Sequence, residues 1–117
     1  MTGEDFERYL GDLLFRLGWS VERTQRSRDG GIDLKALKTD RVGIETRLYV
    51  QCKNRRAPVS VEIERELNGV LEPTVQGVVA SQSAFTADAR RFAEVRGIQL
   101  WDGPHLAALA DLQDESS

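Results

Sequence analysis

Apolar residues near the start of the chain recur at the spacing of one helix face. This pattern predicts an amphipathic helix over residues 3–17, ended by Gly18. Its apolar stripe consists of Phe6, Leu10, Leu13, Leu14 and Leu17. Apolar and polar residues then alternate in three segments, which predicts strands. These segments are residues 19–24, 32–37 and 47–53, separated by the turn signals Asp29-Gly30-Gly31 and residues 39–43.

The second half of the chain alternates between helical and strand patterns. Ser60 is expected to cap a helix, and Thr86 is expected to cap another over residues 87–96. The run from Gly77 to Ala80 is apolar without alternation, as in a strand buried on both faces. The remaining elements are a strand over residues 98–101, a helix that ends near Leu112 and a disordered tail over residues 113–117.

The predicted order of elements is therefore αβββαβαβα, which defines an α/β fold. The first three strands are expected to form an antiparallel meander, because short turns connect them. The later strand-helix-strand unit is expected to add parallel strands through a right-handed crossover. Together these rules predict one mixed sheet flanked by helices on both faces, within a single domain over residues 1–112.

Charge and composition narrow the functional classes. The formal net charge is -3, yet residues 23–56 hold ten basic and four acidic side chains. A basic segment in an acidic protein indicates a polyanionic partner, although solvated Arg and Lys on a hairpin would look the same. One Cys and one His exclude disulfides and most histidine-based chemistry. The absence of a signal peptide or long apolar run indicates a cytoplasmic protein with no membrane partner.

The predicted strand hairpin carries the candidate chemistry. Asp33 follows the glycine turn, and Gln51 and Lys53 share one face of the next strand because they are two residues apart. Mg²⁺ prefers oxygen ligands, with Mn²⁺ as an alternative ion. Asp33 would supply a charged oxygen, Gln51 a neutral one, and the backbone carbonyl of Cys52 a third. Lys53 would orient the attacking water and stabilise charge on a phosphate.

Glu7 lies at the edge of the apolar stripe of the first helix, so its carboxylate would face inward and approach Asp33. Each of these residues also has an ordinary alternative. Asp33 would be a turn residue, Gln51 an exposed strand amide, Lys53 one more cation of the basic stretch, and Glu7 a solvated helix-edge side chain.

Several motifs in order resemble one known family. They are Phe6-Glu7, Leu17-Gly18-Trp19, Asp29-Gly30-Gly31-Ile32-Asp33, Gln51-Cys52-Lys53, Arg65-Glu66-Leu67 and Ala84-Phe85-Thr86. Together with the segment from Ile98 to Gly103, they resemble the catalytic domain of Mrr-like restriction endonucleases over about residues 3–110. This family belongs to the PD-(D/E)xK nuclease superfamily, in the branch where Gln precedes x-Lys.

The resemblance implies a restriction-endonuclease-like core and Mg²⁺-dependent hydrolysis of DNA. By position, Asp33 and Gln51 match the metal-site residues, Lys53 the catalytic lysine, and Glu7 the helix glutamate. Arg55 and Arg56 directly follow the catalytic strand and are candidates for phosphate contacts, as are Arg26 and Arg28 beside the glycine turn. Double-strand cleavage needs two active sites, which suggests a homodimer. Sequence specificity is expected to depend on a recognition domain or partner subunit outside this chain.

Two other hypotheses remain open at this level. The chain would be a DNA-binding or assembly module that kept a nuclease fold without cutting, or a nuclease subunit switched on by a ligand or partner protein. Salt-sensitive DNA binding without cleavage would select the first of these.

Overall fold

The first helix, α1 (Gly3–Arg16), begins at a capping box and buries one face. The computed structural model describes residues 2–24, 31–54 and 56–116. Thr2 Oγ1 accepts a hydrogen bond from the Asp5 N–H, and the Asp5 carboxylate accepts one from the Thr2 N–H. These two bonds satisfy backbone donors that the first turn leaves unpaired. The helix ends just before Gly18, which has a positive φ of 98°.

Within the described residues, five strands form one mixed sheet in the order β1-β2-β3-β4-β5. Their bounds are β1 (Ser20–Arg23), β2 (Leu34–Thr39), β3 (Glu45–Lys53), β4 (Val75–Ser81) and β5 (Gln99–Trp101). The pairs β1–β2 and β2–β3 are antiparallel, whereas β3–β4 and β4–β5 are parallel. The predicted meander, the parallel addition and the element order αβββαβαβα are confirmed.

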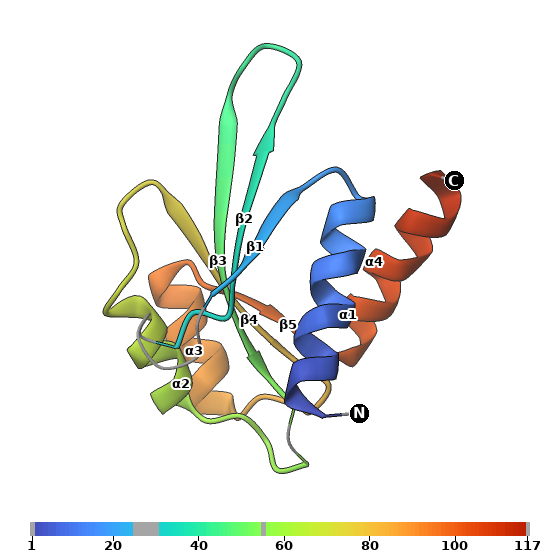
Figure 1. Ribbon diagram of the computed structural model, residues 1–117. Helices are drawn as coiled ribbons and strands as arrows, with labels where there is room; N and C mark the ends of the chain where they lie inside the picture. The colour runs from blue at the N-terminus through green and yellow to red at the C-terminus, as the bar shows by residue number, and fades with distance from the viewer. Residues whose placement is uncertain (1, 25–30, 55, 117) are drawn as a thin grey trace.

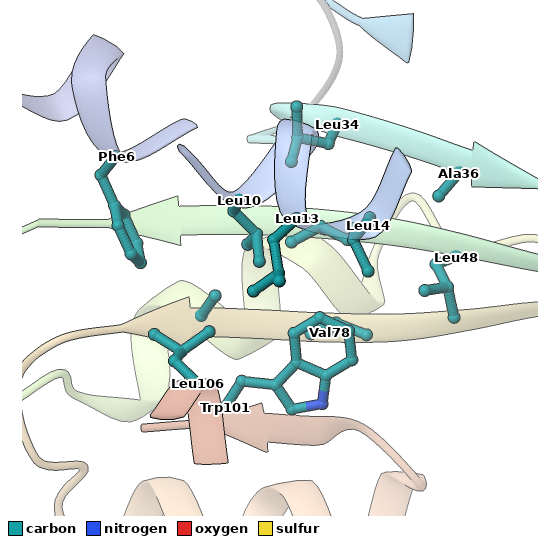
Figure 2. Close-up of a cluster of buried hydrophobic side chains, with 12 residues drawn as sticks. Phe6, Leu10, Leu13, Leu14, Leu34, Ala36, Leu48, Val78, Trp101 and Leu106 are labelled. Carbon is teal, nitrogen blue, oxygen red and sulfur yellow. The ribbon is translucent and has the colours of Figure 1, made fainter. Parts of the chain in front are cut away.

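Helices cover both faces of this sheet (Figure 1). On one face lie α1 and α4 (Gly103–Ser116), and on the other lie α2 (Val61–Asn68) and α3 (Ala87–Arg96). Figure 2 shows the core on the α1 side, where Phe6, Leu10 and Leu14 pack against strand residues. Each fully buried side chain of this size stabilises the fold by roughly 1.5–3 kcal/mol. The turn end of the β2–β3 hairpin extends beyond the other strands and the helices (Figure 1).

Three local expectations differ from the structure. Alternation over residues 32–37 predicts that Ile32, Leu34 and Ala36 share one face. In the structure, Ile32 packs with the α2 and α3 side chains, whereas Leu34 and Ala36 pack under α1. The reason is that β2 begins only at Leu34, so strand alternation does not extend back to Ile32. Ser60 occupies the N-cap position of α2, but its hydroxyl donates to Glu62 and makes no capping bond.

The third difference is at the end of the chain. Helix α4 continues to Ser116, although the polar sequence from residue 113 predicts a disordered tail. No Gly or Pro interrupts Leu112 to Glu115, so nothing in that segment opposes helix. The expected cap at Thr86 is confirmed, since its hydroxyl accepts from the Ala89 N–H at 3.1 Å. Among the described helices, none is long and apolar enough to cross a membrane.

Candidate active site

Asp33 lies one residue before β2, against the last residues of β3. Its N–H donates to the Val50 carbonyl at 2.8 Å, and its carbonyl accepts from the Thr24 N–H at 3.0 Å. Its carboxylate Oδ2 accepts from the Cys52 N–H at 2.7 Å. These bonds hold the carboxylate at the peptide that joins Gln51 to Cys52.

Glu7 brings a second carboxylate to Asp33 from α1. It is only 7% exposed, because Phe6 and Leu10 anchor this part of the helix in the core. Burial raises the pKa of Asp33 to about 6 and outweighs the Cys52 N–H, which lowers it. The Glu7 carboxylate raises this pKa further, and the charge of Lys53 lowers it. Two carboxylates in contact repel each other when ionised, so this pair favours a bound proton or cation.

Arg23 pairs with Glu7 and was not singled out in the sequence. Its Nη2 lies 3.3 Å from Glu7 Oε2, at the end of β1. The pair joins the first helix to the first strand and directs Glu7 toward the sheet. Sixteen residues separate the two side chains, and no local pattern links them. The strand register, which places Arg23 opposite Leu34, is the feature that brings it beside the Asp33 site.

Gln51 is the most buried of the predicted site residues, with 1% of its surface exposed. Its Oε1 has no hydrogen-bond partner among the described residues. A buried polar atom without a partner costs about 1–3 kcal/mol, so a partner for Gln51 Oε1 would stabilise the protein. The ordinary alternative for Gln51, an exposed strand amide, is therefore wrong.

Lys53 is the last residue of β3 and is half-buried. Its positive charge lowers the pKa of Asp33, so the ammonium lies within electrostatic reach of that carboxylate. Cys52 alternates with Gln51 and Lys53 along β3, so it points to the other face of the sheet and packs against the core under α1. Burial raises the pKa of the Cys52 thiol far above its usual range. This agrees with a core residue and not with a thiolate nucleophile.

The predicted DNA contacts are only partly described. Arg56 is exposed three residues after β3, near the candidate site in the chain. Arg26, Arg28 and Arg55 lie outside the described residues. Two lysines of the basic segment 23–56 make contacts within the protein, because their ammonium groups lie over aromatic rings. They are Lys35 over Tyr49 and Lys38 over Trp19.

The donor set at this site suits a hard cation. In the described residues, no group of three or more His, Cys, Asp or Glu side chains is gathered for a metal. The candidate residues instead include two carboxylates in contact, Glu7 and Asp33, and, on the adjacent strand β3, the amide oxygen of Gln51, which has no partner in the described part of the chain. A divalent cation would relieve the repulsion of the carboxylates and give the Gln51 oxygen a partner. The residues therefore fit an oxygen-liganded ion such as Mg²⁺.

A second buried carboxyl group lies on α2 and was also missed. Glu64 is fully buried, and neither of its oxygens has a hydrogen-bond partner in the described part of the chain. Burial raises the pKa of Glu64 from 4.5 to about 7. The buried residues Ile63 and Leu67 form the apolar face of α2. Glu64 is three residues from Leu67, and this spacing is the one sequence signal that Glu64 could be buried.

We expect Glu64→Leu to stabilise the fold, by roughly 1–3 kcal/mol at pH 8, because it removes an unpaired buried charge. In the wild type the folded state binds this proton more tightly than the unfolded state. Stability should therefore fall as pH rises from about 4.5 to about 7. Urea unfolding at pH 5 and pH 8 should show a gain that is larger at pH 8.

The control for this change is Glu62→Leu, because Glu62 is exposed on the same helix. It should give no comparable gain at either pH. A Glu64→Leu gain that is equal at pH 5 and pH 8 would show that the ionised carboxylate is not its source.

The five-stranded mixed sheet with helices on both faces is an α/β fold of the restriction-endonuclease type. The family model Mrr_cat, described as a restriction endonuclease, matches residues 1–110. The chain therefore belongs to this restriction endonuclease family, and the predicted resemblance is confirmed. A search of curated protein sequences found no match.

Solved structures of nucleases share the fold. The DNA modification-dependent restriction endonuclease AspBHI is similar with a TM-score of 0.73 and 20% identity, over 97% of this chain and 31% of AspBHI. MspJI restriction endonuclease in complex with a 27-mer oligonucleotide is similar with a TM-score of 0.69 and 19% identity, over 89% of this chain and 26% of that one. A repair endonuclease from Pyrococcus abyssi is similar with a TM-score of 0.63 and 16% identity, over 87% of this chain and 47% of that one. This chain thus spans about a quarter to a third of AspBHI and MspJI.

Proposed function

We propose that residues 1–112 form an endodeoxyribonuclease domain that hydrolyses DNA phosphodiester bonds with Mg²⁺, in restriction or DNA repair in the cytoplasm. The observation that supports this proposal is the contact of the Asp33 and Glu7 carboxylates at the start of β2, next to the end of β3, which carries Gln51 and Lys53. The oligonucleotide bound to MspJI and the DNA-directed activity named for AspBHI support DNA as the substrate.

Asp33, Glu7, Gln51 and the Cys52 carbonyl would hold the cation. When bound, Mg²⁺ acidifies water and neutralises charge on the phosphate. Asp33 supplies the strongest attraction, because its carboxylate is fixed by the Cys52 N–H. Gln51 adds an oxygen without adding a third negative charge. The ionised form of Asp33 is the binding form, so protons compete with the cation below about pH 6.

Lys53 acts on the substrate from the same face of β3 as Gln51. Its ammonium donates hydrogen bonds to the phosphate or to the attacking water and stabilises the negative charge that develops in the transition state. Arg56, with Arg55, Arg26 and Arg28, would contact the flanking phosphates of the DNA. Such contacts position the duplex and carry no sequence information. Sequence recognition is then the task of a further domain or a partner subunit, and double-strand cleavage that of a homodimer.

The direct test is cleavage of supercoiled plasmid by the purified protein with Mg²⁺, with Mn²⁺ and with EDTA. We expect nicking or linearisation in both metals and none in EDTA. Lys53→Met should lower the rate by roughly 10²–10³-fold, since it removes a preorganised donor from the reacting phosphate. Lys38→Met is the matched control, because Lys38 contacts Trp19 near the far end of β2. This variant should cleave DNA like the wild type.

Other results would select other functions. Cleavage by Lys53→Met at the wild-type rate would remove Lys53 from the mechanism. Salt-sensitive DNA binding without cleavage in either metal would favour a binding or assembly module instead. Cleavage that appears only when a partner protein or ligand is added would identify a conditional nuclease subunit.

A further inference from the structure

Three segments of the chain meet around the side chain of Gln51. Gly31 has a positive φ of 85°, and a Cβ built on it would lie 2.5 Å from Gln51 Nε2 and 2.6 Å from Glu66 Oε1. Both atoms therefore border a space that one methyl group would fill. Only glycine leaves this space open, and only glycine readily adopts this backbone conformation. Because Gln51 Nε2 and Glu66 Oε1 lie 2.5 Å and 2.6 Å from the same point, the two atoms are neighbours at the Gly31 backbone.

The Glu66 carboxylate favours one orientation of this amide. A carboxylate attracts the Nε2 hydrogens, which carry partial positive charge, and repels the amide oxygen. The interaction is strengthened by the burial of Gln51, which removes screening water. With Nε2 directed toward Glu66, Oε1 is the end left for another partner. This is the atom that has no hydrogen-bond partner in the described structure.

We propose that Glu66 is a positioning residue that directs the Gln51 amide oxygen toward the cation site. This inference rests on the proposed function, because it assigns Gln51 Oε1 to the cation. Glu66 itself is exposed on the surface of α2 and acts through Gln51. Partners of this outer kind contribute about 10–100-fold to metal affinity or activity in other metal sites.

The proximity of Glu66 also accounts for an amide at position 51. A glutamate there would place a second carboxylate beside Glu66 in a buried space, and the two charges would repel each other. An amide supplies the metal-facing oxygen and also offers hydrogens to Glu66. Gln51, Gly31 and Glu66 thus form one mutually dependent group.

The test combines Mn²⁺ titration by calorimetry, without DNA, with NMR of the Gln51 side-chain amide. Glu66→Ala should weaken Mn²⁺ binding about 10-fold and shift the Gln51 Nε2 resonance. Glu66→Gln keeps an oxygen that can accept from Gln51, and it should retain most of the affinity. Glu62→Ala, one turn earlier on α2, is the matched control and should change neither quantity.

Two further variants show whether Glu66 acts through Gln51. In a Gln51→Ala background, Glu66→Ala should cause no additional loss of Mn²⁺ affinity. Gln51→Glu alone should leave two carboxylates facing each other, and adding Glu66→Gln should restore affinity. A full additional loss in the Gln51→Ala background would overturn the proposal.

The outcomes also separate this inference from the proposed function. If the wild type binds Mn²⁺ and cleaves DNA while Glu66→Ala changes neither Mn²⁺ affinity nor the amide resonance, the positioning role is wrong and the nuclease function stands. If the wild type binds no metal, the proposed function fails, and with it the metal-directing role of Glu66. The amide resonance would then still report whether Glu66 orients Gln51.

Discussion

Asp33→Asn is expected to abolish DNA cleavage while leaving the fold at least as stable as the wild type. The loss should reach roughly 10²–10³-fold or more, because the charged oxygen that attracts the cation is gone. The asparagine oxygen can still accept from the Cys52 N–H, so the local backbone stays in place. Plasmid cleavage and thermal unfolding at pH 7.5 measure the two effects on the same samples.

The expected stability follows from the pKa of Asp33. Burial raises this pKa from 3.8 to about 6, so the folded state binds the proton more tightly than the unfolded state. The resulting stability is present at low pH and is lost as pH rises through about 6. At pH 7.5 the ionised side chain therefore opposes folding, and asparagine removes that opposition. Active sites often carry such a conflict between function and stability.

Asp12→Asn is the matched control, because Asp12 is exposed on α1 and undergoes the same chemical change. It should leave both cleavage and melting temperature close to those of the wild type. Undiminished cleavage by Asp33→Asn would move the active site elsewhere. A large fall in melting temperature would show that ionised Asp33 supports the fold.

Gly31→Ala is expected to damage both stability and cleavage. The positive φ alone costs about 1–2 kcal/mol for a residue with a Cβ. The new methyl group would also overlap Gln51 Nε2 and Glu66 Oε1. Glu66 is exposed and can move away, but Gln51 is enclosed and must shift within the site. A displacement of about 1 Å in a reacting group can cost about 10²-fold in rate.

Gly43→Ala separates the steric effect from the backbone effect. Gly43 has a φ of 89°, close to that of Gly31, but nothing lies within 4 Å of the Cβ it would carry. It lies in the turn of the β2–β3 hairpin, so it should lose stability through backbone strain alone and keep full cleavage. Equal behaviour of the two variants in urea unfolding and plasmid cleavage would contradict the close contact at Gly31.

Much of the fold follows from local patterns in the sequence. The helical stripe of α1 and the unbroken apolar run of β4 each predict an element and its buried faces, because side-chain direction repeats with a fixed period. The same period of two places Gln51 and Lys53 on one face of β3. A short connection between β2 and β3 then makes antiparallel pairing the expected outcome, which brings Asp33 beside Gln51.

The tertiary structure alone decided how the candidate site is enclosed. Arg23 pairs with Glu7, and Glu66 and Gln51 both approach Gly31, across separations that no local period encodes. The burial of Glu64 is also a tertiary fact, because a carboxylate three residues from an apolar side chain can equally face water. Periodicity determines which face of an element a residue occupies. The packing of one element on another determines which distant residue it meets there, and therefore its pKa, its partners and its chemistry.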